Sequence, residues 1–185
     1  MSASTRRGTL RPHDAFDLIR LLARSQTDPR KATAELVQNS LDAGARRLVV
    51  TRMRERGAAI LKVADDGEGV LPDLTREDAL EHLARNIGHS RKHGLSLEER
   101  RGALGRYGIG ILGFWAIGEE LELRTRVHGG PVLALRLRED QAGYRILGSS
   151  LSTPTDDDDP LREPTCTEIV VRRIHDAALG ALAGR

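Results

Sequence analysis

Four polar side chains gather on one side of a predicted helix over residues 32–43, ATAELVQNSLDA: Glu35, Gln38, Asn39 and Asp42. At helical spacing they fall within an arc of about 100°. Glu35 and Asn39 are one turn apart, so both side chains can reach the same point. An Asn oxygen is a suitable Mg²⁺ ligand, and a neighbouring carboxylate can accept a proton from a water that attacks a phosphate. Considered alone, an exposed polar helix face explains the same pattern.

A second candidate lies in VADDGEGV, residues 63–70, where an apolar strand ends at Asp65. A carboxylate in that position can accept a hydrogen bond from an exocyclic amine. Gly67 and Gly69 would let the backbone approach a flat ring closely. An ordinary Asp-Gly hairpin turn is the alternative. A calcium loop is excluded because the oxygen ligands are not at the required offsets.

A third candidate is the glycine-rich stretch GALGRYGIG, residues 102–110. It overlaps a G-x-G-x-x-G pattern, but no strand precedes it, so this match to a dinucleotide fingerprint is weak. A glycine-rich turn that opens a helix can still bind phosphate through free amides. The sequence contains no G-x-x-x-x-G-K-[ST] loop, so a nucleotide site of P-loop type is excluded.

The periodicity predicts the elements that must position these residues. We expect helices over 14–25, 29–43, 76–85 and 108–118, and strands over 46–55, 58–65, 120–127, 131–139, 143–150 and 166–174. Asp28 with Pro29, and Thr75 with Asp78, supply N-terminal capping signals. The acidic run over 152–164 is expected to be disordered. Along the chain, helices come first and are followed by strands that pair mostly with their neighbours. This order predicts an α+β two-layer sandwich, with a mixed, mostly antiparallel sheet and helices on one face.

The composition is that of an ordinary globular chain. Its 185 residues suffice for one domain with a core, and a net charge of +2 is too small to identify a nucleic-acid or membrane surface. The single cysteine, Cys166, excludes an intramolecular disulfide and favours a reducing compartment. Neither a membrane span nor a secretory signal is expected, so we predict a cytoplasmic protein with no membrane partner.

Together, four motifs in this order resemble those of the GHKL superfamily, the ATPases shared by gyrase B subunits, ninety-kilodalton heat-shock chaperones, sensor histidine kinases and MutL proteins. ELVQNSLDA resembles the N box of that superfamily, DDGEG its first glycine box, GRYGIG its second, and TEIVV the strand with a supporting threonine. The resemblance covers residues 14–174 and implies the Bergerat-type ATP-binding fold.

The resemblance implies roles for individual residues. Glu35 would activate water, Asn39 would bind Mg²⁺, and Asp65 would contact adenine with the support of Thr167. The full set of implied ATP-binding residues is Asn39, Asp42, Asp65, Gly67, Gly69, Ser90, Lys92, Gly105, Arg106, Tyr107, Gly108, Ile109, Gly110 and Thr167.

One departure from the family pattern is Cys166, where a glycine usually precedes the threonine; its larger side chain is expected to narrow the adenine pocket. We assign only structural roles to Thr33, Gln38 and Ser40.

The implied domain organisation is an N-terminal arm over 1–13, an ATP-binding domain over 14–174 and a tail or linker over 175–185. Within the domain, residues 86–107 would form an ATP lid and 152–164 an acidic loop.

The motifs look most like the chaperone, MutL and MORC branch. This resemblance implies an ATP-binding, Mg²⁺-dependent ATP-hydrolysing N-terminal module of a larger clamp-like ATPase, of chaperone or DNA-associated type. Such a module would hydrolyse ATP slowly in isolation, form a homodimer when nucleotide is bound, and act on a client protein or DNA through regions outside this chain. The alternatives are a protein or histidine kinase domain and a nucleotide-sensing module without turnover.

Overall fold

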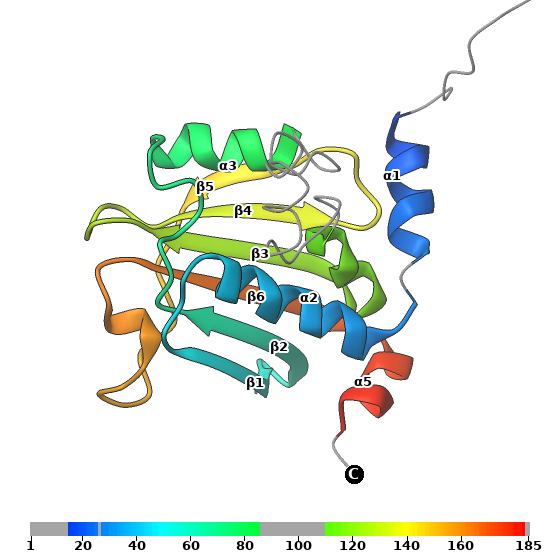
Figure 1. Ribbon diagram of the computed structural model, residues 1–185. Coiled ribbons are helices and arrows are strands. Elements are labelled where there is room, and N and C mark those ends of the chain that lie inside the picture. Colours follow the sequence, from blue (N-terminus) through cyan, green and yellow to red (C-terminus); the bar gives the residue numbers. More distant parts are fainter. Residues whose placement is uncertain (1–14, 26, 86–109, 184–185) are drawn as a thin grey trace, which may run out of the picture.

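The computed structural model describes residues 15–25, 27–85 and 110–183 (Figure 1). In chain order the elements are α1 Ala15–Arg24, α2 Pro29–Asp42, β1 Leu48–Glu55, β2 Ala58–Asp65, α3 Arg76–Arg85, the 3₁₀ helix η2 Gly110–Ala116, β3 Gly118–Arg126, β4 Leu133–Arg138, β5 Arg145–Gly148, the 3₁₀ turn η3 Pro160–Arg162, β6 Cys166–Ile174 and α5 Asp176–Leu182.

The strands form a six-stranded sheet in the order β1-β2-β6-β3-β4-β5, and every pairing is antiparallel. Strand β6, the last in the sequence, lies in the middle of the sheet between β2 and β3. This position brings the end of the chain beside the strand that carries Asp65. The predicted α+β sandwich is therefore confirmed, although the sheet was expected to be mixed and the described pairings are all antiparallel. Figure 1 shows α2 and α3 on one face of the sheet.

Local capping signals set the helix boundaries as expected. The Asp28 carboxylate accepts a hydrogen bond from the Arg30 amide at 2.9 Å, and Pro29 occupies the first turn of α2. At the start of α3, the Thr75 hydroxyl oxygen accepts from the Asp78 amide at 3.1 Å. The same hydroxyl donates to the Asp78 carboxylate at 2.7 Å, so Thr75 and Asp78 are joined by two hydrogen bonds at the start of the helix.

The main core lies between the helices and one face of the sheet. Leu36 of α2, Leu80 of α3 and Phe114 of η2 are fully buried there. They pack with the strand residues that point to the same face, among them Val63 and Leu121. Alternate strand residues point to the opposite face, which carries both charged and apolar side chains. Within the described ranges, no helix combines the length and apolarity that crossing a membrane requires.

Two segments differ from the sequence-based expectation. The run over 152–164 is not disordered, because the buried Asp159 carboxylate accepts from the Leu161 amide at 3.0 Å and Leu161 packs with Ala64 and Cys166. The helix predicted over 108–118 ends earlier than expected, and its described part is the 3₁₀ helix η2, which ends at Ala116.

Candidate functional site

The carboxylate of Asp65 lies at the end of β2, directly beneath the C-terminal half of α2. Its side chain is buried, with 3% of its surface exposed. Oδ2 accepts a hydrogen bond from the Ser40 hydroxyl at 2.6 Å, and Oδ1 accepts one from the Gly67 amide at 3.0 Å. Two donors from different segments therefore fix the orientation of this carboxylate.

The environment of Asp65 has opposing effects on its charge. Burial raises the pKa of Asp65, the hydrogen bonds from Ser40 and Gly67 lower it, and the nearby charge of Asp66 raises it; the net result is a raised pKa. A carboxylate in this state gains from any further donor that approaches it, because each new hydrogen bond stabilises the charged form. Asp65 therefore keeps acceptor capacity beyond the two hydrogen bonds that it already receives.

Polar residues on two neighbouring strands line up with Asp65. Thr167 of β6 is the direct partner of Asp65 in the sheet, and Thr125 of β3 is the direct partner of Thr167. Residues opposite each other on adjacent strands share a face, so all three side chains point toward the helices. Thr125 is fully buried, and its hydroxyl oxygen accepts from the Val70 amide at 3.1 Å. It therefore anchors the turn that follows Asp65.

The two glycines of this turn are required by close packing. A Cβ atom on Gly67 would lie 2.9 Å from Oδ1 of Asp65 and 2.9 Å from the Ala43 carbonyl oxygen. Gly69 has a φ of +79°, and a Cβ atom there would lie 2.7 Å from Cγ2 of Val127. The glycines hold the turn between the end of α2 and the end of β3, and their predicted contact with a flat ring stays a prediction.

Helix α2, which is joined to this carboxylate through Ser40, also carries the predicted site residues Glu35 and Asn39. Its buried face consists of Ala32, Leu36 and Ser40, at a spacing of one turn. Glu35 and Asn39 each precede a member of that stripe, so they lie on its flank, where Glu35 is half-buried and Asn39 is exposed. Within the described ranges, neither side chain makes a hydrogen bond or an ion pair. Both groups are therefore available to a ligand.

Asp42 is exposed, and its Oδ1 atom accepts a hydrogen bond from Nε2 of Gln38 at 3.0 Å. The two side chains are one turn apart on the outer face of α2. This contact gives Asp42 a partner on its own helix.

Cys166 does not narrow the space above Asp65, contrary to the sequence-based expectation. It is fully buried, but it packs with Ala64 and Leu161 on the face of the sheet away from the helices. The reason is strand alternation, since Thr167 takes the helix-facing position and its neighbour must point the other way. Burial raises the pKa of the Cys166 thiol to about 11.

Two residues of this site, Ser40 and Thr125, were missed by the sequence reasoning. Ser40 continues the buried stripe of α2, and Thr125 occupies an inward position of β3 after Leu121 and Leu123. In both cases the available signal was a polar residue at a position where the periodicity of the helix or strand calls for an apolar one.

Several expected ATP-binding residues lie outside the described residues: Ser90, Lys92, Gly105, Arg106, Tyr107, Gly108 and Ile109, together with the predicted lid over 86–107. Gly110 is the first residue of η2, which packs against α2. The contacts predicted for these residues stay predictions.

Comparison with known proteins gives one family match. A model described as "Histidine kinase-, DNA gyrase B-, and HSP90-like ATPase" matches residues 27–143. This range contains the candidate residues of α2 and of the turn after β2, and it ends before Thr167.

Similar proteins include ATPase morc-1 of Caenorhabditis elegans, 35% identical over 117 residues, which are 61% of this chain and 12% of that protein. DNA mismatch repair protein MutL of Anaeromyxobacter sp. (strain K) is 38% identical over 123 residues, 64% of this chain and 17% of the relative. MutL of Rhizorhabdus wittichii is 53% identical over 45 residues, 24% of this chain and 7% of the relative. The chain therefore matches less than a fifth of the length of each of these relatives.

Proposed function

Because the chain belongs to the family of histidine kinase-, DNA gyrase B- and HSP90-like ATPases, we propose that it is a Mg²⁺-dependent ATP-hydrolysing module whose adenine contact is Asp65. The observation that carries this assignment is the buried Asp65 carboxylate, oriented by Ser40 and Gly67 at the end of β2. It lies beside the helix that presents Glu35 and Asn39.

Recognition of adenine follows from the hydrogen-bonding capacity of Asp65. Each carboxylate oxygen has two acceptor positions, and Ser40 and Gly67 occupy one on each oxygen. A free position on Asp65 would accept the exocyclic amine of adenine. Thr167, the sheet partner of Asp65, would support the base from the adjacent strand.

The donor set fits a magnesium ion bound to nucleotide phosphates. Asn39 offers a neutral oxygen on an exposed, unengaged side chain, which suits a site where phosphates and water supply the other ligands. When bound, Mg²⁺ would neutralise charge on the phosphates. Glu35, one turn earlier, would orient a water and accept its proton. The free carboxylate of Glu35 is the feature that favours hydrolysis over binding without turnover.

Incubation of the chain with ATP labelled at the γ-phosphate tests this function. We expect slow release of free phosphate, loss of that release in Glu35→Gln, and unchanged ATP binding in the same variant. Glu77→Gln, the same change at an exposed position of α3, should hydrolyse ATP at the wild-type rate. Label transferred to a protein would instead indicate a kinase, and bound but intact ATP would indicate a nucleotide sensor.

The role of the whole protein is a further part of the proposal. Since two of the relatives above are named DNA mismatch repair proteins, we propose that DNA is the client of this module. We also propose that bound nucleotide promotes a homodimer. Sedimentation with and without a non-hydrolysable ATP analogue would show a mass increase only with the analogue, whereas a constant monomer mass would contradict the dimer.

A further inference from the structure

The face of the sheet opposite the helices carries a network of charged side chains in which buried carboxylates are shared between cations. Glu122 is 1% exposed and Glu168 is fully buried. Nε of Arg124 and Nε of Arg136 both lie 2.6 Å from Glu122 oxygens, and an amino group of Arg172 lies 3.4 Å away. A single carboxylate is thus shared by three guanidinium groups.

The second buried carboxylate, Glu168, is shared in the same way. Arg124 lies 2.8 Å from its Oε2 atom, and Lys62 lies 3.8 Å from its Oε1 atom. The two buried carboxylates are thus shared by four cations, of which Arg172 also pairs with Glu55 at 2.9 Å.

At the edge of the sheet formed by β4 and β5, two arginines face each other directly. Arg136 of β4 and Arg145 of β5 are cross-strand partners, so their side chains leave the sheet on the same face. Like charges in this arrangement are destabilising unless something lies between them. Arg145 is exposed, and its guanidinium has no hydrogen bond or ion pair to any other residue in the described part of the chain.

These two arginines line a polar cavity of about 150 Å³. Its other lining residues are Glu120, Arg138, Gln141 and Gly143. Arg138 is already paired with Asp140, through contacts of 3.0 Å and 3.1 Å. We call these lining residues the arginine pocket. Among the described residues, its unpaired donors are the guanidinium of Arg145 and the terminal amino groups of Arg136, whose Nε is held by Glu122.

We propose that the arginine pocket binds phosphate groups of duplex DNA. A guanidinium presents a planar fork of donors that matches a phosphate, and two such forks side by side favour a group with several acceptor oxygens. The choice of DNA as the ligand rests on the proposed function. The arginine pocket would be the surface through which this module contacts DNA. The pocket lies on the face of the sheet away from Asp65.

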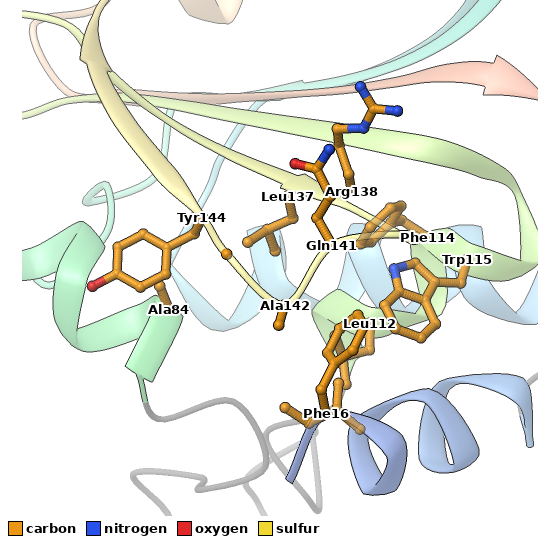
Figure 2. A pocket seen from close by; sticks show the side chains of 12 residues that line it. Phe16, Ala84, Leu112, Phe114, Trp115, Leu137, Arg138, Gln141, Ala142 and Tyr144 are labelled. Atoms are coloured by element: carbon orange, nitrogen blue, oxygen red, sulfur yellow. The ribbon is translucent and has the colours of Figure 1, made fainter. Parts of the chain in front are cut away.

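The position of the aromatic residues favours a duplex over a single strand. The four aromatic side chains of the described residues, Phe16, Phe114, Trp115 and Tyr144, line a neighbouring apolar cavity on the helix side. This cavity shares Arg138, Gln141 and Gly143 with the arginine pocket, and Figure 2 shows the Arg138 side chain extending away from the rings. Single strands are held mainly by bases stacked on aromatic rings. The face with the arginine pocket has no such ring among the described residues, so backbone contacts to a duplex suit it better.

Binding of a short fluorescent duplex to the full chain, followed by anisotropy between about 50 and about 200 mM salt, tests the proposal. The variant Arg136→Gln with Arg145→Gln should bind about tenfold more weakly, with a salt slope smaller by about 2. Glu120→Gln, which removes the negative charge from the pocket, should bind more tightly than wild type. The control is Arg54→Gln with Arg56→Gln, two exposed arginines at the β1–β2 turn, which should bind as wild type does.

Three results would overturn the proposal: no duplex binding by the wild-type chain, equal loss in both double variants, or preferential binding of polyglutamate. A single strand that binds more tightly than the duplex would overturn the choice of a duplex. ATP binding is measured on the same samples. If ATP does not bind but only the pocket variants lose DNA binding, the proposed ATPase function is wrong and the pocket proposal stands. If ATP binds and any of the overturning results is obtained, the pocket proposal is wrong and the proposed ATPase function stands.

Discussion

The Ser40 hydroxyl donates a hydrogen bond of 2.6 Å to the Asp65 carboxylate, and this contact joins α2 to the end of β2. It couples the helix that carries Glu35 and Asn39 to the strand end that carries the proposed adenine contact. Both side chains are almost fully buried, so water does not compete for the bond. The relative placement of the two halves of the site depends on this contact.

Ser40→Ala should weaken both stability and nucleotide binding. Removal of the hydroxyl leaves Oδ2 of Asp65 without its donor, which we expect to cost about 1 to 3 kcal/mol of unfolding free energy. Because the bond from Ser40 lowers the pKa of Asp65, its loss should also raise that pKa further. Denaturant unfolding and ATP titration at several pH values measure both effects.

Thr33→Ala is the matched control for this change. Thr33 also lies on α2, and its hydroxyl donates to the Pro29 carbonyl at 2.8 Å, far from Asp65 in the helix. We expect little change in stability and no shift in the pH dependence of ATP binding. If Ser40→Ala and Thr33→Ala gave the same pH profile, Ser40 would have only a structural role.

ATP affinity should fall on acidification at a higher pH than an ordinary aspartate would cause. The amine of adenine donates to the ionised form of Asp65, and burial keeps the pKa of that group above its usual range. Affinity should therefore be constant near neutral pH and decrease as the pH falls through the raised pKa. Calorimetric titrations from about pH 8 to about pH 4 measure this; a pH-independent affinity would contradict it.

The same shift predicts the effect of Asp65→Asn on the free domain. A pKa raised by folding means that Asp65 contributes stability below its unfolded-state pKa and loses it as the pH rises through the folded-state pKa. Relative to wild type, Asp65→Asn should therefore become more stable as the pH increases from acidic to neutral. Thermal unfolding at a series of pH values checks the sign of this difference, and the opposite slope would be inconsistent with a raised pKa.

Gly69→Ala should be strongly destabilising, by about 2 to 4 kcal/mol, because it combines a positive φ with a backbone and side-chain clash. Gly44→Ala, where φ is +71° and the space is open, separates the two causes and should cost only about 1 kcal/mol. Gly148→Ala, with open space and no positive φ, should leave stability unchanged or slightly higher. Chemical denaturation of the three variants would reject the packing role of Gly69 if their stabilities were equal.

Local signals in the sequence predicted α1, α2, α3 and the first hairpin well, but not α5, which lies in the predicted tail. Asp28, Pro29 and the Thr75–Asp78 pair act within a few residues, so their effect is visible without a fold. The hydrophobic periodicity likewise predicted which class of sandwich would form. These features depend on short-range geometry.

Other features depend on contacts between distant segments and were not predictable in the same way. The central position of β6 comes from its pairing with β2 and β3, which no local pattern encodes. The direction of the Cys166 side chain follows from that register. Leu161 is buried because it packs on Cys166, so the acidic run around it is held in place.

Titration of ATP into the wild-type chain and Asp65→Asn tests the central claim most directly. We predict that wild type binds ATP and that Asp65→Asn loses a hundredfold or more in affinity, about 2.7 kcal/mol, because the amide cannot replace the charged acceptor. Asp176→Asn, the same change at an exposed position at the start of α5, should bind as wild type does. A folded Asp65→Asn variant with wild-type affinity for ATP would contradict the assignment of Asp65 as the adenine contact.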